Sequence, residues 1–280
     1  MSEHLNSEQE PEGRDPDWDF NEVADTESVH GMDGTESSEE QTASDSELEI
    51  ELPNIYAHLA FVAGATGITG REVVAALADR GIETIAHIRE DSPYVNEWIE
   101  YFRQVGSGVD TTAWEQEEIS LRLADVRPSL VFCLLGSSEQ RMKGDENFKP
   151  NSFVDSYKAV DLGLTSMLIR ACVSAGEENL RFILASAVGT DENSSSPFLQ
   201  MKAKAEDFLI QSGLNYTIVR VGAIAESDRG GREQPPYRGL LGMKRRLPIM
   251  EAVEARPLAE TLVDVALTPD CVNRIFETDL

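Results

Sequence analysis

The stretch "HLAFVAGATGITGREVVAALADRG", residues 58–81, decides the fold of this chain. Its first six residues form a short apolar run, which is typical of a buried strand. Three glycines follow at positions 64, 67 and 70, and apolar residues then recur at helical spacing over residues 68–80. A strand, a glycine-rich turn and a helix in this order indicate the first unit of a dinucleotide-binding α/β fold.

The spacing of the glycines predicts a phosphate-binding turn. Gly64 permits the tight turn, Gly67 lets the backbone approach a pyrophosphate, and Gly70 lets the helix pack closely on the strand. Any sharp turn can use glycines, but here a second strand follows the helix, which is the required context. The anion would bind unpaired N–H groups at the positive end of the helix dipole. We therefore predict that the whole turn contacts the cofactor: Gly64, Ala65, Thr66, Gly67, Ile68, Thr69 and Gly70.

The remainder of the chain continues the alternation of apolar runs and helical patterns. This alternation predicts a doubly wound parallel sheet of Rossmann type, covered on both faces, with a small C-terminal substrate-side region. We expect further strands over residues 82–88, 129–135, 180–186 and 215–221, and further helices over 92–103, 112–124, 153–176, 197–213 and 256–267. Residues 225–256 show no clear period and predict a loop-dominated insert.

The charge is concentrated at the N-terminus. Residues 1–51 carry 18 acidic and one basic side chain, out of 51 acidic and 24 basic in the whole chain. Such a segment cannot bury enough apolar surface to offset the entropy of ordering. We predict a disordered acidic tail over residues 1–53 and one NAD(P)-binding domain over 54–280. The tail would keep the chain soluble; alternatively, it docks a protein partner or is phosphorylated on its serines.

Composition excludes several classes of function. An acidic chain repels nucleic-acid phosphates, and no run approaches the roughly 20 apolar residues of a membrane span. The three cysteines, Cys133, Cys172 and Cys271, have no metal-like spacing, and a metal site is not expected. With no signal-peptide pattern either, we expect a cytoplasmic protein that binds neither nucleic acid nor membrane.

The end of the second strand bears on the choice of cofactor. An acid there would bond a ribose 2′-hydroxyl, whereas an arginine accommodates the 2′-phosphate of NADP. The strand ends with Arg89, 22 positions after Gly67, and Glu90 and Asp91 follow. We predict NADP with Arg89 as a ligand, and NAD remains the alternative if the acids face the ribose instead.

With these elements assembled, the chain resembles the atypical, or extended-type, short-chain dehydrogenase/reductases. Within that group it is similar to the NAD(P)H-binding NmrA-like proteins, and most of all to Tat-interacting-protein-like oxidoreductases. The resemblance extends from His58 to the C-terminus and rests on "VAGATGITGREVV", "VFCLLGSSEQRMKG", "SYKAVDLG", "LASAVG", "FLQMKAKAE" and "IVRVGAIAESDRGG".

The resemblance implies roles for residues beyond the glycine turn. Further cofactor-binding residues would be Leu135, Gly136, Ser137, Lys202 and Val221, the first three on the ribose and nicotinamide side. The catalytic residues would be Ser186, beside the substrate carbonyl, and Lys202, which would hold the nicotinamide ribose.

One position departs from the family pattern. The tyrosine expected four residues before Lys202, which would donate a proton, is Phe198 here. Tyr157 precedes a lysine without the helical spacing that aligns such a pair, and Tyr216 begins a strand. The chain is therefore either an NADP-dependent oxidoreductase on a small carbonyl, assisted by Ser186 or water, or a nucleotide-sensing module that binds a partner protein. A sugar-nucleotide epimerase is a weaker alternative, because it also needs the tyrosine.

The sequence also contains an arginine cluster in the predicted insert. Its members are Arg229, Arg232, Arg238, Arg245 and Arg246. They would form solvated pairs with neighbouring acids, or alternatively clamp an anionic substrate or the 2′-phosphate.

Overall fold

The computed structural model describes residues 58–137, 152–222 and 254–278. The chain divides into two units, Met1–Glu51 and Leu52–Leu280, and every described residue belongs to the second unit. The predicted tail over residues 1–53 and most of the predicted insert, with its arginine cluster, lie outside the described residues. Their structure stays a prediction.

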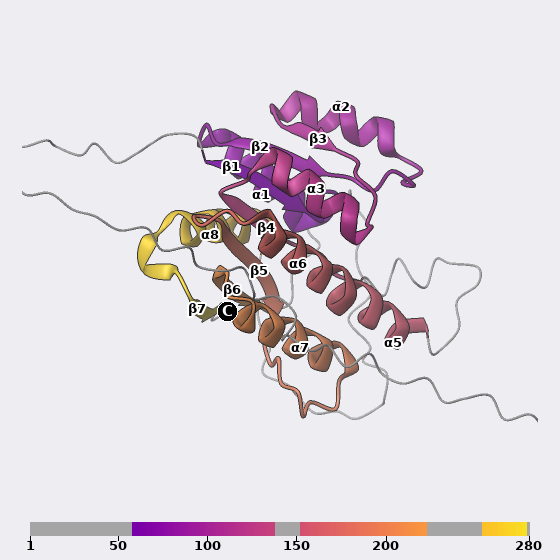
Figure 1. The fold of residues 1–280 in the computed structure, drawn as a ribbon, viewed down its shortest axis with the longest axis vertical. Helices are drawn as coiled ribbons and strands as arrows, with labels where there is room; N and C mark the ends of the chain where they lie inside the picture. The colour runs from indigo at the N-terminus through magenta and orange to yellow at the C-terminus, as the bar shows by residue number, and fades with distance from the viewer. Residues whose placement is uncertain (1–57, 138–151, 223–253, 279–280) are drawn as a thin grey trace, which may run out of the picture. The chain divides into compact units, whose positions relative to one another are not determined.

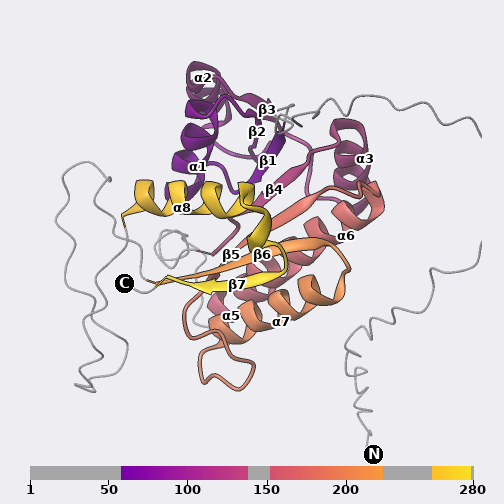
Figure 2. The same ribbon diagram turned by 90° about the vertical axis from the view of Figure 1, so that its left-hand side faces the viewer.

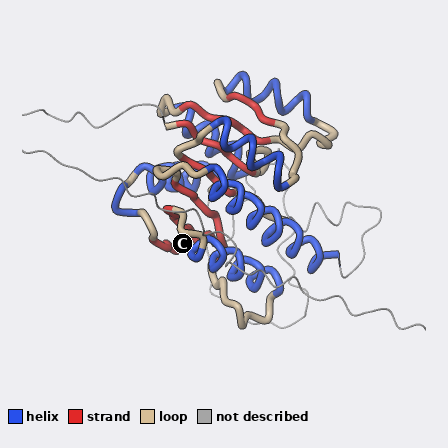
Figure 3. Tube along the Cα trace, viewed as in Figure 1, coloured by secondary structure: helices blue, strands red, loops and turns tan. Residues whose placement is uncertain are grey.

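A seven-stranded parallel sheet forms the centre of the second unit (Figures 1 and 3). The strand order is β3-β2-β1-β4-β5-β6-β7. The strands are β1 (Leu59–Ala63), β2 (Glu83–His87), β3 (Gly108–Asp110), β4 (Leu130–Cys133), β5 (Arg181–Ala187), β6 (Asn215–Val221) and β7 (Arg274–Glu277). All six neighbouring pairs are parallel. The predicted doubly wound sheet of Rossmann type is confirmed.

Helices cover both faces of this sheet, as Figure 2 shows. Helices α1, α2 and α8 pack on one face, and α3, α6 and α7 pack on the other. Their bounds are α1 (Ile68–Asp79), α2 (Val95–Val105), α3 (Gln116–Val126), α6 (Thr165–Ala175), α7 (Pro197–Gln211) and α8 (Ala255–Leu267). A short helix α5 (Ser152–Ser156) and a π-helix η2 (Tyr157–Leu164) lead into α6. A 3₁₀ turn, η3 (Pro269–Cys271), follows α8.

The alternation of side chains along β1 explains how one strand serves both faces. Ala60 and Val62 belong to the core beneath α1 and α8, while Phe61 and Ala63 belong to the core beneath α3 and α6. Successive side chains of a strand point to opposite faces, so a strand covered on both sides must be apolar throughout. This is why the sequence shows an unbroken apolar run.

The strand order creates a crevice beside β1. From β1 the chain winds outward through β2 and β3, then returns to place β4 on the other side of β1. Ala60 pairs with Thr84 of β2 and with Leu130 of β4. Ligands of open α/β sheets bind at such a switch point, outside the carboxyl ends of the strands. The glycine turn begins at this place, directly after β1.

Three features of the chain differ from the expected elements. The short edge strand β3 lies between the two helices expected over residues 92–103 and 112–124, and a further strand, β7, lies near the C-terminus. The long helix predicted over residues 153–176 is interrupted by η2, whose eight residues have π-helical geometry. Such π-helical segments frequently occur at functional sites.

Candidate functional site: the cleft at the switch point

The glycine turn leaves no room for side chains at two of its positions. Gly64 has a φ of +84°, and a Cβ there would lie 2.6 Å from the carbonyl oxygen of Leu134. A Cβ on Gly70 would lie 2.2 Å from the carbonyl oxygen of Gly64. Gly70 therefore allows α1 to approach the turn, and Gly64 allows the turn to approach the end of β4. The roles predicted for these glycines agree with this geometry.

The first turn of α1 presents backbone donors that have no partner among the described residues. Gly67 is the N-cap and has no side chain to satisfy them, and the first turn contains no acidic residue. The Gly67 N–H donates to the Gly64 carbonyl at 3.0 Å, and the Arg71 N–H donates to the Gly67 carbonyl at 3.1 Å. The amides of residues 68–70 come before the first intrahelical bond and lie at the positive end of the helix. This is a site for an anion.

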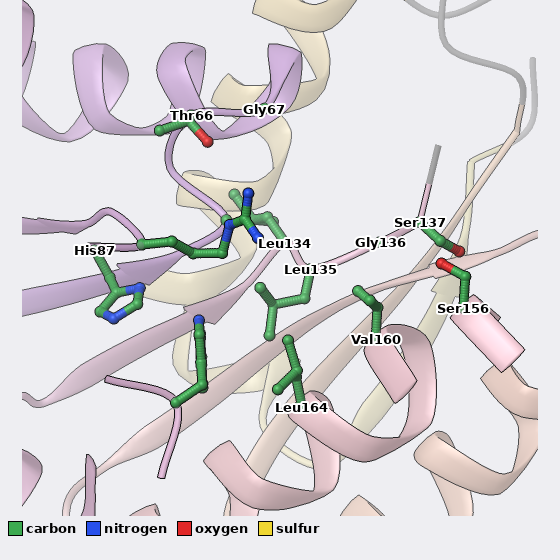
Figure 4. A pocket seen from close by; sticks show the side chains of 13 residues that line it. Thr66, Gly67, His87, Leu134, Leu135, Gly136, Ser137, Ser156, Val160 and Leu164 are labelled. Carbon is green, nitrogen blue, oxygen red and sulfur yellow. The ribbon is translucent and has the colours of Figure 1, made fainter. Parts of the chain in front are cut away.

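A cleft of about 230 Å³ lies directly beside this turn (Figure 4). Seven of the predicted site residues line it: Gly64, Thr66, Gly67, Arg89, Leu135, Gly136 and Ser137. The other lining residues are His87, Trp114, Leu134, Ser156, Val160 and Leu164. The cleft thus extends from the glycine turn toward the end of β2 on one side and toward the end of β4 on the other.

Several predicted cofactor residues do not line the cleft. Ala65 is fully buried beneath the turn, and Val221 belongs to the core at the end of β6. Ile68, Thr69 and Gly70 would act through their backbone amides, which requires no side chain in the cleft. For all five residues, contact with a cofactor stays a prediction.

Arg89 follows β2 and lines the cleft, and its contact with a cofactor stays a prediction. Its side chain is 53% exposed and lies 3.6 Å from Asp91 in a surface ion pair. Glu90 and Asp91 are exposed and do not line the cleft. Of the three charged residues that end this strand, only the arginine faces the cleft.

Two aromatic residues beside Arg89 were not predicted to belong to the site. His87 is buried, its ring lies 4.7 Å from that of Trp114, and its Nε2 lies 2.8 Å from the Thr112 carbonyl oxygen. A carbonyl only accepts, so Nε2 carries the proton and Nδ1 is an acceptor. Burial lowers the pKa of His87, although the Thr112 bond opposes this shift. The position of His87, two residues before Arg89 at a strand end, is the signal that could have placed it here.

On the β4 side, one face of the helix that includes η2 forms the wall of the cleft. Ser156, Val160 and Leu164 all line it, at successive spacings of four residues (Figure 4). The spacing of four residues is visible in the sequence of the long predicted helix. It shows which residues share a helix face, but not that this face lines a cleft.

Lys202 lies behind this wall and does not line the cleft. Its ammonium donates to the Leu135 carbonyl oxygen at 3.2 Å and lies 3.0 Å from Asp161 Oδ1. The Lys202 side chain is 5% exposed and the Asp161 side chain is fully buried. Lys202 as a direct ribose ligand therefore stays a prediction, and its contacts in the structure are with the protein.

Phe198 lies close both to Lys202 and to an aromatic ring from the neighbouring helix. The Lys202 ammonium lies 5.8 Å from the centre of the Phe198 ring. The centre of the Tyr157 ring, from the start of η2, lies 5.4 Å from the centre of the Phe198 ring. The contact between Tyr157 and Phe198 arises from the packing of η2 against α7. Sequence spacing therefore gave no reason to place Tyr157 near Lys202.

Ser186 is buried at the end of β5 within a polar network. Its hydroxyl donates to the carboxylate of Glu206 and lies 3.3 Å from the Thr190 hydroxyl. Glu206 also accepts from the Arg220 guanidinium, with the shortest contact at 2.7 Å. Ser186 does not line the cleft. Its catalytic role stays a prediction, and the observed bond commits its hydroxyl proton to Glu206.

The described residues offer no metal-binding cluster, and two of the three cysteines are buried. They contain no group of three or more His, Cys, Asp or Glu residues that could hold a metal ion. Cys133 and Cys172 are buried, and burial raises the pKa of each thiol. None of the described helices combines the length and apolar character that crossing a membrane requires.

The comparisons with known proteins agree with this geometry. A family model described as NAD(P)H-binding matches residues 64–266. A chloroplastic protein of Arabidopsis thaliana, uncharacterized protein At2g34460, is 28% identical over 234 residues, which cover 78% of this chain and 75% of the relative. Protein TIC 62, chloroplastic, of the same plant is 30% identical over 185 residues, which cover 59% of this chain but 27% of TIC 62.

Among solved structures, a putative NAD-dependent epimerase/dehydratase from Bacillus halodurans shares the fold. Its TM-score is 0.59 at 22% identity, and the match covers 79% of this chain and 93% of that chain. The bare amides of the α1 N-terminus and the cleft beside them fit a dinucleotide. The chain belongs to the NAD(P)H-binding family and is an atypical short-chain dehydrogenase/reductase of the NmrA-like type.

Proposed function

We propose that the protein binds NADPH in the cleft and acts as a nucleotide-sensing module, whose occupied state is read by a partner protein. The amides of residues 68–70 would bind the diphosphate, and Arg89 would bind the 2′-phosphate. Leu135, Gly136 and Ser137 would contact the ribose and nicotinamide half on the β4 side. The family match supports nicotinamide dinucleotide binding.

The preference for NADP over NAD is supported by the side chains at the end of β2. Arg89 lines the cleft, while Glu90 and Asp91 do not. A guanidinium is a strong ligand for phosphate, and an acid in this position would instead favour the ribose hydroxyl of NAD. Arg89 is largely exposed, so it can swing onto a bound phosphate by leaving its weak contact with Asp91.

The observation that carries the non-catalytic proposal is the state of the three proton-transfer positions. Phe198 has no proton to transfer, the Ser186 hydroxyl is bonded to Glu206, and the Lys202 ammonium is paired with Asp161. A lysine activates a neighbouring phenol by lowering its pKa, and a lysine neutralised by a buried carboxylate does this weakly. General acid catalysis typically contributes about 10²–10⁴ in rate.

A second candidate function is slow NADPH-dependent reduction of a small carbonyl compound. Its support is the contact of Tyr157 with Phe198, which brings a phenol to the neighbourhood of the missing one. Bound NADPH would supply a hydride to the carbonyl carbon. Tyr157 would give its phenolic proton to the carbonyl oxygen and recover one from solvent.

Titrations of the purified chain with NADPH and NADH test the proposal. Trp114, one of three tryptophans in the chain, lines the cleft, so its share of the tryptophan emission should change when the cleft is occupied. We expect saturable binding of NADPH that is tighter than that of NADH. The proposal is overturned if neither nucleotide changes the emission and a titration with 2′,5′-ADP shows no binding either.

An assay at 340 nm then separates the two candidates. NADPH is mixed with the protein and a panel of aldehydes and ketones, such as 4-nitrobenzaldehyde. The sensing module predicts binding without oxidation above the buffer rate. Oxidation that is present in the parent chain and lost in Tyr157→Phe, with unchanged NADPH affinity, would favour the reductase.

The cellular setting follows as part of the same proposal. We propose a cytoplasmic location and a protein partner that contacts the acidic tail. Pull-down of the full chain with and without NADPH, followed by the same experiment without residues 1–53, tests both the partner and its dependence on the nucleotide.

A further inference from the structure

The helix η2, which forms the cleft wall, faces α7 across matched pairs of residues. Tyr157 and Asp161 lie four residues apart on η2, and Phe198 and Lys202 lie four residues apart on α7. Tyr157 contacts Phe198 and Asp161 contacts Lys202. Side chains four apart share one helix face, so the four residues form a single seam between η2 and α7.

Asp161 lies at the centre of the polar part of this seam. Its Oδ2 accepts from the Ser137 N–H at 3.1 Å and also from the Ser137 hydroxyl. Its Oδ1 lies 3.0 Å from the Lys202 ammonium in an ion pair, and it has no hydrogen-bond partner among the described residues. The carboxylate is fully buried, so the ammonium is its only described counter-charge.

The contacts of Lys202 and Asp161 converge on residues 135–137, a segment that lines the cleft. Lys202 holds the carbonyl of Leu135, and Asp161 holds both the amide and the hydroxyl of Ser137. Residues 135–137 line the cleft, whereas neither Asp161 nor Lys202 does. This segment follows β4, on the opposite side of the glycine turn from Arg89, and so faces the nicotinamide half of a dinucleotide whose diphosphate lies on α1.

We propose that Asp161 is a positioning residue for residues 135–137, and that Lys202 acts on the cofactor through Asp161 and Leu135 rather than by touching it. The inference rests on the proposed function, because it requires a dinucleotide in the cleft. Removing one partner of a buried ion pair leaves an uncompensated charge, so breaking the Lys202–Asp161 pair carries a large cost. The Lys202–Asp161 pair is therefore expected to persist when the cofactor binds, and its effect is to fix the geometry of residues 135–137.

A double-mutant cycle tests the proposal. The variants are Lys202→Met, Asp161→Asn and both together, and Lys204→Met is the matched control because Lys204 is exposed on the same helix. Each variant is titrated with NADPH and with 2′,5′-ADP, which lacks the nicotinamide and its ribose. Near-ultraviolet circular dichroism confirms that each variant folds.

The proposal predicts the same pattern for both single variants. Each single variant lowers the affinity for NADPH about tenfold, which is within the range for coupled buried pairs. The affinity for 2′,5′-ADP stays within about twofold of that of the parent chain. The double variant is no weaker than the worse single variant, because both changes break one unit. Lys204→Met leaves both affinities unchanged.

A direct lysine ligand predicts a different result. Lys202→Met would then lower the affinity for NADPH. Asp161→Asn would leave this affinity unchanged, or raise it because the ammonium is freed. Either outcome for Asp161→Asn overturns the inference. Equal loss of both ligands in the single variants would mean general destabilisation and also overturns it. If the parent chain binds neither ligand, the proposed function fails as well, so the two failures are distinguishable.

Discussion

Gly70→Ala should damage both the stability of the fold and its grip on the nucleotide. A Cβ at this position would lie 2.2 Å from the Gly64 carbonyl oxygen and 2.8 Å from the Cα and carbonyl oxygen of Ala65. All three atoms are backbone, so no side chain can move aside. Ordinary contact begins near 3.4 Å, so the turn and the helix must separate by about 1 Å.

The size of the effect follows from two opposing contributions. Overpacking costs about 1–3 kcal/mol, and alanine in place of a helical glycine returns about 1 kcal/mol. We therefore expect the free energy of unfolding to fall by about 1 kcal/mol, and by about 2 kcal/mol at most. Separation of the turn from α1 also moves the amides of residues 68–70. Loss of one hydrogen bond to a charged phosphate lowers the affinity for NADPH about 10- to 100-fold.

Urea unfolding and tryptophan-emission titration measure the two effects. Gly67→Ala is the graded comparison, because its Cβ would lie 3.2 Å from the Gly64 carbonyl oxygen at a φ of −68°. Gly108→Ala, whose Cβ would meet only ordinary contacts, is the control. A Gly70→Ala protein with parental stability and NADPH affinity within twofold would refute the close-approach reasoning.

Three other changes have defined outcomes. Arg89→Gln should weaken NADPH about tenfold or more and leave NADH within about twofold in parallel titrations, because only NADPH carries the 2′-phosphate; equal loss of both would contradict this. Arg181→Met should lower the unfolding free energy by about 2–4 kcal/mol in urea, since the buried guanidinium donates to the carbonyls of Ala266 and Thr268 and to the Thr217 hydroxyl. The exposed Arg274→Met is its control, and equal effects would refute the assignment. His87 is held neutral by burial, which lowers its pKa. Below about pH 6.5 the unfolded chain binds a proton that the folded chain does not, so stability falls as the pH falls, and His87→Gln should flatten that slope in urea melts between pH 7 and 5.

Much of the fold could be predicted from the sequence because the central strands are buried on both faces. Their unbroken apolar runs and the caps of the helices between them are local signals. β3 and β7 gave no such signal. β3 is three residues long, and three of the four residues of β7 are exposed, so neither shows a period. Their pairing is set by β2 and β6, which lie elsewhere in the chain.

The site divides in the same way. The glycine turn and Arg89 belong to one continuous segment, so spacing was enough to place them. The seam between η2 and α7 joins residues 41 positions apart, such as Asp161 and Lys202, and depends on the π-helical geometry of η2. The bond between Ser186 and Glu206 likewise depends on how α7 packs on β5. Spacing rules carry no information about such contacts.

The central claim is that the backbone amides at the start of α1 bind a dinucleotide diphosphate. Titration of ¹⁵N-labelled protein with NADPH, followed by amide chemical shifts, tests it most directly. We expect the signals of Ile68, Thr69 and Gly70 to shift saturably, while those of Gly176 and Gly213, which line a separate hollow away from the cleft, stay in place. NADPH that binds with no change at residues 68–70, or that does not bind, would contradict the claim.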